Sequence, residues 1–141
     1  MRVFLSGVIQ GSTDGRRVED QGYRQQLTDI LRAWQPAVEI IDPWAIWPDA
    51  VGYDTEKATA TLFEELALAA QADALVAYLP VASMGTALEM WCAHRAGVPI
   101  YSITPMRHNW AINALSTRVF DSIAAFAAFV QEGGLLAPRK G

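Results

Sequence analysis

The residues with the clearest potential for chemistry lie in one short segment, Ser83 to Glu89. Ser83 and Gly85 form a small, hydroxyl-bearing loop in which backbone N–H groups at the start of a helix can approach a phosphate or a sugar. Glu89 follows one helical turn inside that helix and adds a carboxylate. The segment therefore predicts a site for a ligand of nucleotide size. A second interpretation is structural, because Thr86 and Glu89 also match the capping box that begins many helices.

Few other side chains have a spacing that supports catalysis. His94 and His108 are isolated, and no cysteine and histidine residues have the spacing of a metal site. The sequence has neither the glycine pattern of dinucleotide-binding loops nor a Walker lysine motif. We therefore expect no metal and no organic cofactor. Carboxylates remain, and carboxylate chemistry on a sugar nucleotide predicts cleavage of a glycosidic bond through an oxocarbenium-like transition state.

Strands and helices alternate along the chain, which is typical of a parallel sheet with helices on both faces. Short apolar runs predict strands at 2–6, 38–41, 74–79, 98–103 and, as a fifth candidate, 118–120. Apolar residues at helical spacing predict helices at 23–34, 55–72, 86–96, 110–115 and 121–131. Residues 43–53 have no period and predict a loop. The predicted fold class is α/β, an open parallel sheet of four or five strands.

The candidate binding residues gather at one edge of this predicted sheet. They lie in the segments that follow strands, at 7–17, 42–53, 80–86 and 104–113. Because ligands of open parallel sheets bind at the carboxyl ends of the strands, we expect one shared pocket. The second of these segments begins with Asp42 and contains Trp47, an aromatic residue that would stack on a base or contact another subunit.

Length and composition limit the classes of function. The 141 residues, 52% of them hydrophobic, fit one domain over 1–134 with a frayed tail at 135–141. The net charge is −4 and the 11 basic residues form no stripe, which argues against a nucleic-acid polymer as partner. No apolar run approaches the roughly 20 residues of a membrane span, and the first residues do not resemble a secretory leader. We therefore expect no membrane association and a cytoplasmic location.

Several motifs together resemble the nucleoside 2-deoxyribosyltransferase superfamily, which includes 2′-deoxynucleoside 5′-phosphate N-hydrolases and CMP N-glycosidases. They are Val3-Phe4-Leu5-Ser6-Gly7 with Ile9-Gln10-Gly11, Ala72-Asp73-Ala74-Leu75-Val76, Ser83-x-Gly85-Thr86-x-x-Glu89, and Gly97-Val98-Pro99-Ile100. The resemblance implies a flavodoxin-like (Rossmann-like) fold and a small-molecule nucleoside or nucleotide as partner. It also implies a homodimer in which a neighbouring subunit completes each active site.

The resemblance assigns roles to individual residues. Glu89 would be the nucleophile that attacks the anomeric carbon as the base leaves. Ser83 and the backbone at Gly85 match the positions that hold a 5′-phosphate, and Gly7 matches the glycine that lets the first loop pass close to the sugar. Asn113 lies near the position from which the partner subunit contributes a polar group to the phosphate.

Three positions depart from the family pattern and bear on the substrate. Glu65 replaces the usual aspartate and would position or protonate the leaving base, unless it is an ordinary glutamate on a helix surface. Gln10 stands where phosphate-binding members tend to have arginine, so Arg16 or Arg17 would have to reach a 5′-phosphate instead. Phe4 stands where deoxy-specific members have tyrosine and ribonucleotide-cleaving members have phenylalanine, which predicts that ribo substrates are accepted.

From these residues we predict an N-glycosidase that acts on a nucleoside or nucleoside 5′-monophosphate with retention of configuration. Glu89 is the predicted nucleophile, Glu65 assists the leaving base, and water resolves the glycosyl-enzyme intermediate. Two alternatives stay open at this point. One is a deoxyribosyltransferase that passes the sugar to a second base, and the other is a catalytically silent nucleotide sensor on the same fold.

Overall fold

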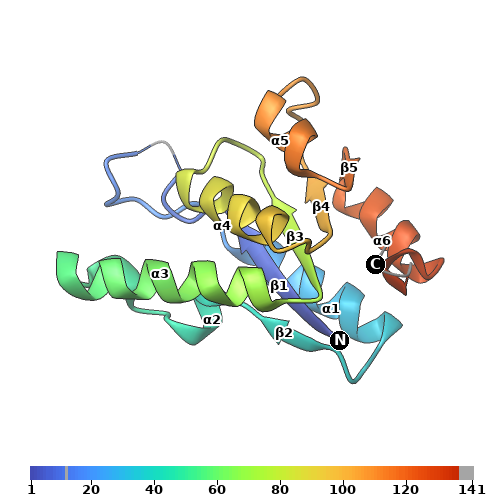
Figure 1. The fold of residues 1–141 in the computed structure, drawn as a ribbon, viewed down its shortest axis with the longest axis horizontal. Helices are drawn as coiled ribbons and strands as arrows, with labels where there is room; N and C mark the ends of the chain where they lie inside the picture. The colour runs from blue at the N-terminus through green and yellow to red at the C-terminus, as the bar shows by residue number, and fades with distance from the viewer. Residues whose placement is uncertain (12, 137–141) are drawn as a thin grey trace.

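The computed structural model describes residues 1–11 and 13–136, which form a five-stranded parallel sheet between two layers of helices (Figure 1). The strands are β1 (Arg2–Gly7), β2 (Glu39–Ile41), β3 (Ala74–Tyr78), β4 (Ile100–Ile103) and β5 (Arg118–Phe120). Their order is β2-β1-β3-β4-β5, and every neighbouring pair is parallel. This order is that of flavodoxin-like folds. The predicted fold class is confirmed, and so is the fifth strand.

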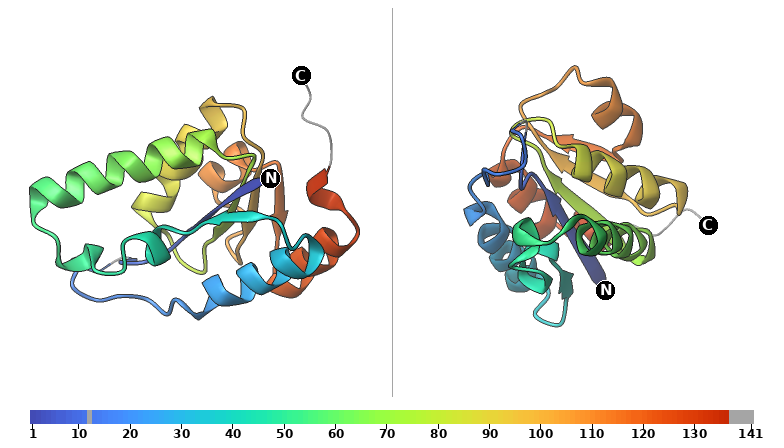
Figure 2. Two further views of the ribbon diagram at one scale, coloured as in Figure 1. Left: turned by 90° about the horizontal axis from the view of Figure 1, so that it is seen from below. Right: turned by 90° about the vertical axis from the view of Figure 1, so that its left-hand side faces the viewer.

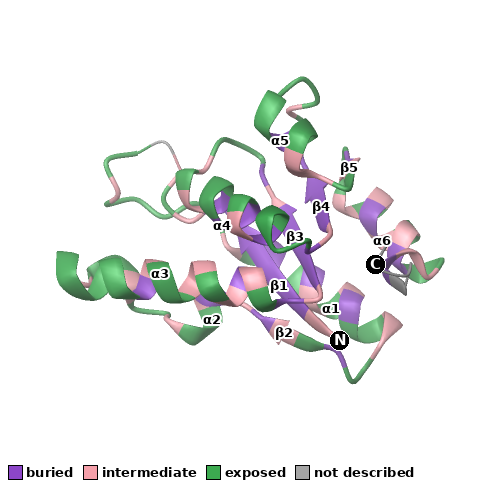
Figure 3. Ribbon diagram, viewed as in Figure 1, coloured by how far each residue is buried: buried purple, intermediate pink, exposed green. Residues whose placement is uncertain are grey.

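Helices cover both faces of the sheet (Figure 2). One face carries α1 (Gly22–Trp34) and α6 (Ile123–Gln131), and the other carries α3 (Thr55–Gln71), α4 (Met84–Arg95) and α5 (Trp110–Leu115). Each face has its own core, with Leu27 and Phe126 in the first and Ala69 and Met90 in the second. The central strands are buried almost throughout (Figure 3), which explains why they appear in the sequence as continuous apolar runs.

Two short helices occupy a segment for which the sequence predicted a loop. Helix α2 (Pro43–Ile46) begins after Asp42, whose side chain accepts a hydrogen bond from the backbone N–H of Trp44. A proline is well tolerated at its first position. The 3-10 helix η1 (Ala50–Gly52) follows. Elements of three or four residues are too short to produce an apolar period, so the pattern could not reveal them.

The first two residues of the predicted frayed tail belong to a short helix. Gly134–Leu136 form a second 3-10 helix, η2, and Leu135 is buried in the core beside α6. The remainder of the predicted tail, 137–141, lies outside the described residues. Within the part of the chain that the structure describes, no helix is long and apolar enough to cross a membrane.

Candidate active site

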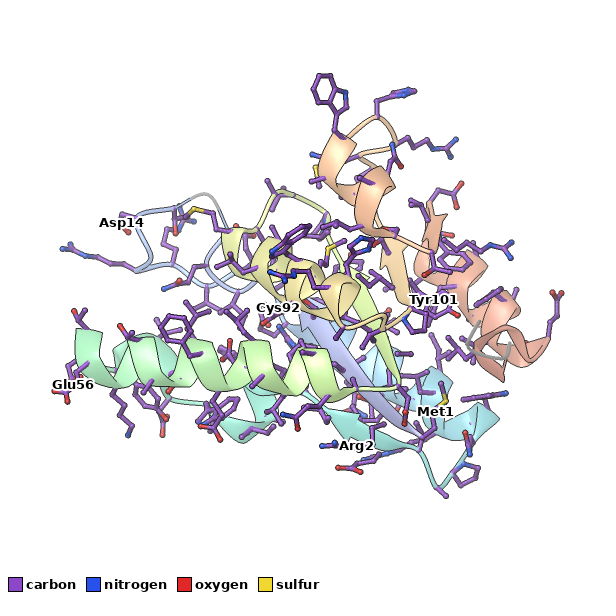
Figure 4. All side chains as sticks on the ribbon, viewed as in Figure 1. Met1, Arg2, Asp14, Glu56, Cys92 and Tyr101 are labelled. Atoms are coloured by element: carbon purple, nitrogen blue, oxygen red, sulfur yellow. The ribbon has the colours of Figure 1, made fainter. Side chains whose placement is uncertain are left out.

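A cavity of about 460 Å³ lies at the carboxyl end of β1, between α3 and the start of α4. This volume is in the range of small-molecule sites. Its walls come from the end of β1 and the following loop, the η1 region, α3 and the first turns of α4. Asp14 in that loop and Glu56 at the start of α3 lie at the same end of the molecule (Figure 4). Three of the four predicted segments therefore meet here, whereas 104–113 does not line this cavity.

Glu89 lies on α4 and lines the cavity, although only 6% of the residue is exposed. Its Oε2 atom accepts a hydrogen bond from the hydroxyl of Ser6, a buried residue of β1. A carboxylate held in this way has a fixed orientation, because the strand and the helix that carry the two groups are both rigid elements.

Glu65 lies on α3 and lines the same cavity. Burial raises the pKa of Glu89 to about 8 and that of Glu65 to about 6. These values include smaller effects of neighbouring groups. The hydrogen bond from Ser6 lowers the pKa of Glu89 and the nearby Glu65 carboxyl raises it, while the positive charge of Arg24 lowers both pKa values. Glu65 is therefore no isolated surface glutamate. The two carboxyls titrate together, and near neutral pH the pair holds one proton.

The capping interpretation of Glu89 is wrong. Helix α4 begins at Met84, two residues earlier than predicted, and its N-cap is Ser83, whose side chain accepts a hydrogen bond of 3.2 Å from the backbone N–H of Thr86. Glu89 lies in the second turn, beyond the reach of a cap. The carboxylate thus has no capping role to explain its presence, and its buried position beside Glu65 is a feature of the cavity.

Four other predicted site residues also line the cavity: Gly7, Gln10, Ser83 and Gly85. A Cβ atom at Gly85 would meet no atom within 4 Å, so the glycine leaves open space at the start of α4. Gln10 donates a hydrogen bond of 3.0 Å to the carbonyl of Gly15, which closes the first loop on itself. A Cβ atom at Gly7 would overlap the ring and hydroxyl of Tyr23, so this glycine permits close packing of α1.

Two predicted binding residues are engaged elsewhere. Phe4 is fully buried in the core that α3 and α4 form with the sheet, and it does not line the cavity. Asp42 caps α2 and forms an ion pair of 2.7 Å with Arg24. Both residues have structural roles in this chain, because the Phe4 side chain packs in the core and the Asp42 carboxylate is paired with the buried Arg24.

Trp47 and Asn113 also lie outside the cavity lining. Trp47 ends α2, and it is Tyr53 from the same segment that brings an aromatic ring to the cavity. The amide of Asn113 donates a hydrogen bond of 2.8 Å to the carbonyl of Arg107 and lines a second cavity, near the ends of β4 and β5. Within this chain Asn113 therefore does not meet Glu89.

Two buried polar residues near the site had no role in the sequence analysis. Ser6 is a polar residue that directly follows the apolar run Val3-Phe4-Leu5 of β1, and this position was the signal for it in the sequence. Arg24 is buried on α1, next to the apolar stripe that predicted this helix, and nothing in its spacing distinguishes it from an exposed arginine. Among the described residues, no group of three or more histidine, cysteine, aspartate or glutamate side chains is arranged to hold a metal ion.

No family model matches the chain, and no curated protein sequence matches it. Solved structures do match. A conserved protein from Enterococcus faecalis V583 has a TM-score of 0.69 at 17% identity, covering 94% of this chain and 98% of that one. The 2-deoxyribosyltransferase from Bacillus psychrosaccharolyticus has a TM-score of 0.68 at 15% identity and covers 96% of each chain. The CMP N-glycosidase BcmB from Clostridium botulinum has a TM-score of 0.50 at 16% identity, covering 96% of this chain and 99% of that one. The chain thus shares the fold of these structures, an open parallel sheet of the flavodoxin-like order that the sequence resemblance implied.

Proposed function

We propose that the protein is an N-glycosidase that cleaves the bond between sugar and base in a nucleoside or nucleoside 5′-monophosphate. The observation that carries this proposal is the placement of two carboxyls, the buried Glu89 and the partly exposed Glu65, in one cavity of about 460 Å³. With pKa values of about 8 and about 6, the pair would hold one proton near neutral pH. Two carboxyls with one proton between them supply a nucleophile and an acid together. Similarity of fold to a 2-deoxyribosyltransferase and a CMP N-glycosidase supports nucleosides as the substrate class.

Before the reaction Glu89 holds the proton of the pair, because its pKa is the higher of the two. In the first proposed step this proton passes to Glu65, which leaves Glu89 ionised. A carboxylate oxygen of Glu89 attacks C1′ of the sugar as the bond between C1′ and the base nitrogen breaks. The electron pair of that bond passes to the base, which Glu65 protonates. Positive charge that develops on the sugar favours the ionised form of Glu89, so the proton of the pair moves to Glu65 as the transition state forms. The products are free base and a glycosyl ester of Glu89.

Water resolves the ester in the second step. Glu65, now a carboxylate, accepts a proton from the water, whose oxygen attacks C1′ and displaces Glu89. Two inversions at C1′ retain the configuration. Inverting enzymes separate their carboxyls by about 6.5–9.5 Å to hold a water between them. Glu65 and Glu89 line one cavity and shift each other's pKa values, which indicates a closer spacing and supports the retaining course.

The cavity lining bears on the 5′-phosphate. Among the described residues that line the cavity, none is lysine or arginine. A phosphate would therefore depend on Ser83, on the space at Gly85, and on the backbone N–H groups at the start of α4. We propose that unphosphorylated nucleosides are accepted as well as, or better than, their 5′-monophosphates.

The proposal is tested by incubating the protein with a panel of ribo- and deoxynucleosides and their 5′-monophosphates, and measuring released base by chromatography. Wild-type protein should release base, Glu89→Gln should not, and Glu64→Gln, a change at an exposed neighbour on α3, should behave as wild type. Parallel reactions with free acceptor bases test the second candidate, a transferase, which the similarity to the 2-deoxyribosyltransferase favours. Binding without release of base from any substrate would refute both and leave a sensor.

We further propose that the protein is a homodimer. Helix α4 exposes Met84, Leu88 and Trp91, which lie one helical turn apart on one face, and Trp110 on α5 is 90% exposed. Exposed apolar groups gathered in this way mark contact surfaces. Sedimentation should show a dimer for the wild type and a monomer for Trp91→Lys. The control is Phe63→Lys, a change at an exposed aromatic on α3, which should remain dimeric. A monomeric wild type at micromolar concentration would contradict the proposal.

A further inference from the structure

Strand β1 loses its neighbour β2 just before it reaches the active site. The pairing with β2 ends at Phe4 and Ile41, while β1 continues to Gly7 beside β3. At these last residues Arg24, which lies on α1, donates hydrogen bonds to the carbonyls of Leu5 (3.4 Å) and Gly7 (3.3 Å). A side chain therefore binds the end of the strand where β2 has stopped.

Arg24 is itself held in place. Its Nη1 atom lies 2.7 Å from Oδ1 of Asp42, and its Nε atom lies 2.7 Å from Oε1 of Gln21. The side chains of Arg24 and Asp42 are 5% and 13% exposed. A guanidinium has five donors in one plane and can reach all of these acceptors, whereas an ammonium group is a single point of charge. A buried ion pair adds little stability in general, so its use here calls for another explanation.

Ser6 lies between the two residues whose carbonyls Arg24 binds. Side chains alternate along a strand, so Ser6 faces the opposite side of the sheet from Leu5 and Gly7. On that side its hydroxyl donates to Oε2 of Glu89. A shift of the strand end would move this hydroxyl, and with it the carboxylate. The other oxygen, Oε1, does not take part in this hydrogen bond.

We propose that Ser6 and Arg24 are positioning residues for the nucleophile. Arg24 fixes the end of β1 on both sides of Ser6, and the Ser6 hydroxyl holds Oε2 of Glu89 so that Oε1 attacks the sugar. The catalytic part of this inference rests on the proposed function. The effect of Ser6 and Arg24 on the titration of Glu89 is independent of the proposed function, because it can be measured without any substrate.

The direction of that effect follows from the groups that face Glu89. Ser6 from β1 contacts Glu89 directly and Glu65 from α3 lines the same cavity, while Tyr23 and Arg24 from α1, on the other face of the sheet, interact with it electrostatically. Burial raises the pKa of Glu89 most and Glu65 raises it further, whereas the hydrogen bond from Ser6 and the charge of Arg24 lower it. Loss of the Ser6 hydroxyl should therefore move the titration of Glu89 to higher pH.

The first test compares Ser6→Ala with Ser102→Ala. Ser102 is a matched control, because it is a buried serine of β4 whose hydroxyl lies 2.7 Å from that of Ser116, away from the cavity. Ser6→Ala should lower kcat by about 10- to 100-fold with little change in KM, the range for a hydrogen bond to a charged group. The titration of Glu89, followed by NMR of ¹³C-labelled glutamate carboxyls and assigned with Glu89→Gln, should shift upward. Ser102→Ala should do neither.

Equal behaviour of Ser6→Ala and Ser102→Ala in both measurements would overturn the role of Ser6. If Ser6→Ala does not fold, Ser6→Cys takes its place, since a thiol has nearly the same shape and is a weak donor. A wild-type protein that cleaves no nucleoside would refute the proposed function instead. In that event the NMR titration still decides whether Ser6 controls the ionisation of Glu89.

The second test separates the geometry of Arg24 from its charge. Arg24→Lys keeps the positive charge but loses the planar group of five donors that binds the end of β1. We therefore expect kcat to fall by about 10-fold, while the titration of Glu89 stays close to that of wild type. The double variant Arg24→Met/Asp42→Asn removes both charges together and leaves no buried charge unpaired. It should lower kcat and also shift the titration upward. Wild-type kcat in Arg24→Lys, measured on protein whose thermal melt shows it to be folded, would refute the positioning role.

Discussion

Replacing Glu89 by glutamine should stabilise the protein at alkaline pH while it abolishes turnover. Burial raises the pKa of this carboxyl from its ordinary value of 4.5 to about 8 in the folded protein. The folded state therefore holds the proton more tightly than the unfolded state, so wild-type stability falls as the pH rises from about 4.5 to about 8. Glutamine has the same shape, can accept the hydrogen bond from Ser6, can donate one to Glu65, and carries no charge at any pH.

The size of the effect follows from the same two values. The difference between 4.5 and about 8 is about 3.5 pKa units, and at 1.36 kcal/mol for each unit it sets an upper bound of about 5 kcal/mol above pH 8. For a domain of about this length, 1 kcal/mol changes Tm by roughly 2–4 °C, so we expect Glu89→Gln to melt above wild type at pH 9 by at most about 10–20 °C. Below pH 4.5 the carboxyl is protonated in both states, and the two proteins should melt together.

Thermal melts followed by circular dichroism at pH 4, 7 and 9 measure this difference. Glu64→Gln is the control, because Glu64 is the exposed neighbour of Glu65 on α3 and its replacement should change Tm equally at every pH. A Tm difference between Glu89→Gln and wild type that does not grow between pH 4 and pH 9 would refute the reasoning. It would mean that the folded protein does not exclude the charge of Glu89 from its interior.

Three further predictions concern catalysis. The productive enzyme has one proton on the pair of Glu65 and Glu89, so kcat/KM should follow a bell-shaped pH profile. Its limbs should lie near pH 6 and pH 8, the pKa values of Glu65 and Glu89. A profile that is flat from pH 5 to 9 would contradict this. Glu65→Gln should slow substrates with poor leaving bases by ~10²–10⁴-fold and activated substrates much less, whereas equal losses in steady-state assays of both would indicate a folding role. Gly85→Ala should raise the free energy of unfolding, measured by denaturant titration, by up to about 1 kcal/mol, because alanine favours the helix. It should also raise KM, because the added methyl group enters the open space of the cavity. An unchanged KM would show that the substrate does not use that space.

Most of the fold could be predicted because its signals are local. The apolar run 74–79 marks a strand buried on both faces. Gly97, whose φ of 75° suits glycine, follows the end of α4 and is a local signal for that end. The start of α4 was misplaced because two hydroxyl residues could serve as its cap, and only the backbone shows that Ser83 does so. Helix α2 was missed because four residues are too few for a period.

The site could be predicted only in part. Glu89 and the residues at the start of α4 belong to one short segment, so their spacing was enough to place them together. Glu65 came from the family resemblance, and the structure brings its carboxyl to Glu89 from a different helix. Asp42 and Asn113 follow strands as predicted but lie outside this cavity, because the position of a residue after a strand does not determine the direction of its side chain.

The sequence by itself determined the elements, their order along the chain and the segment that carries the candidate nucleophile. Only the tertiary structure decided which buried polar groups meet: Ser6 with Glu89, and Arg24 with Asp42. No periodic pattern in the sequence reveals such pairs, because a hydrogen bond between them depends on where two distant segments of backbone place their side chains. That placement exists only once β1 lies between β2 and β3, with α1 on one face of the sheet and α4 on the other.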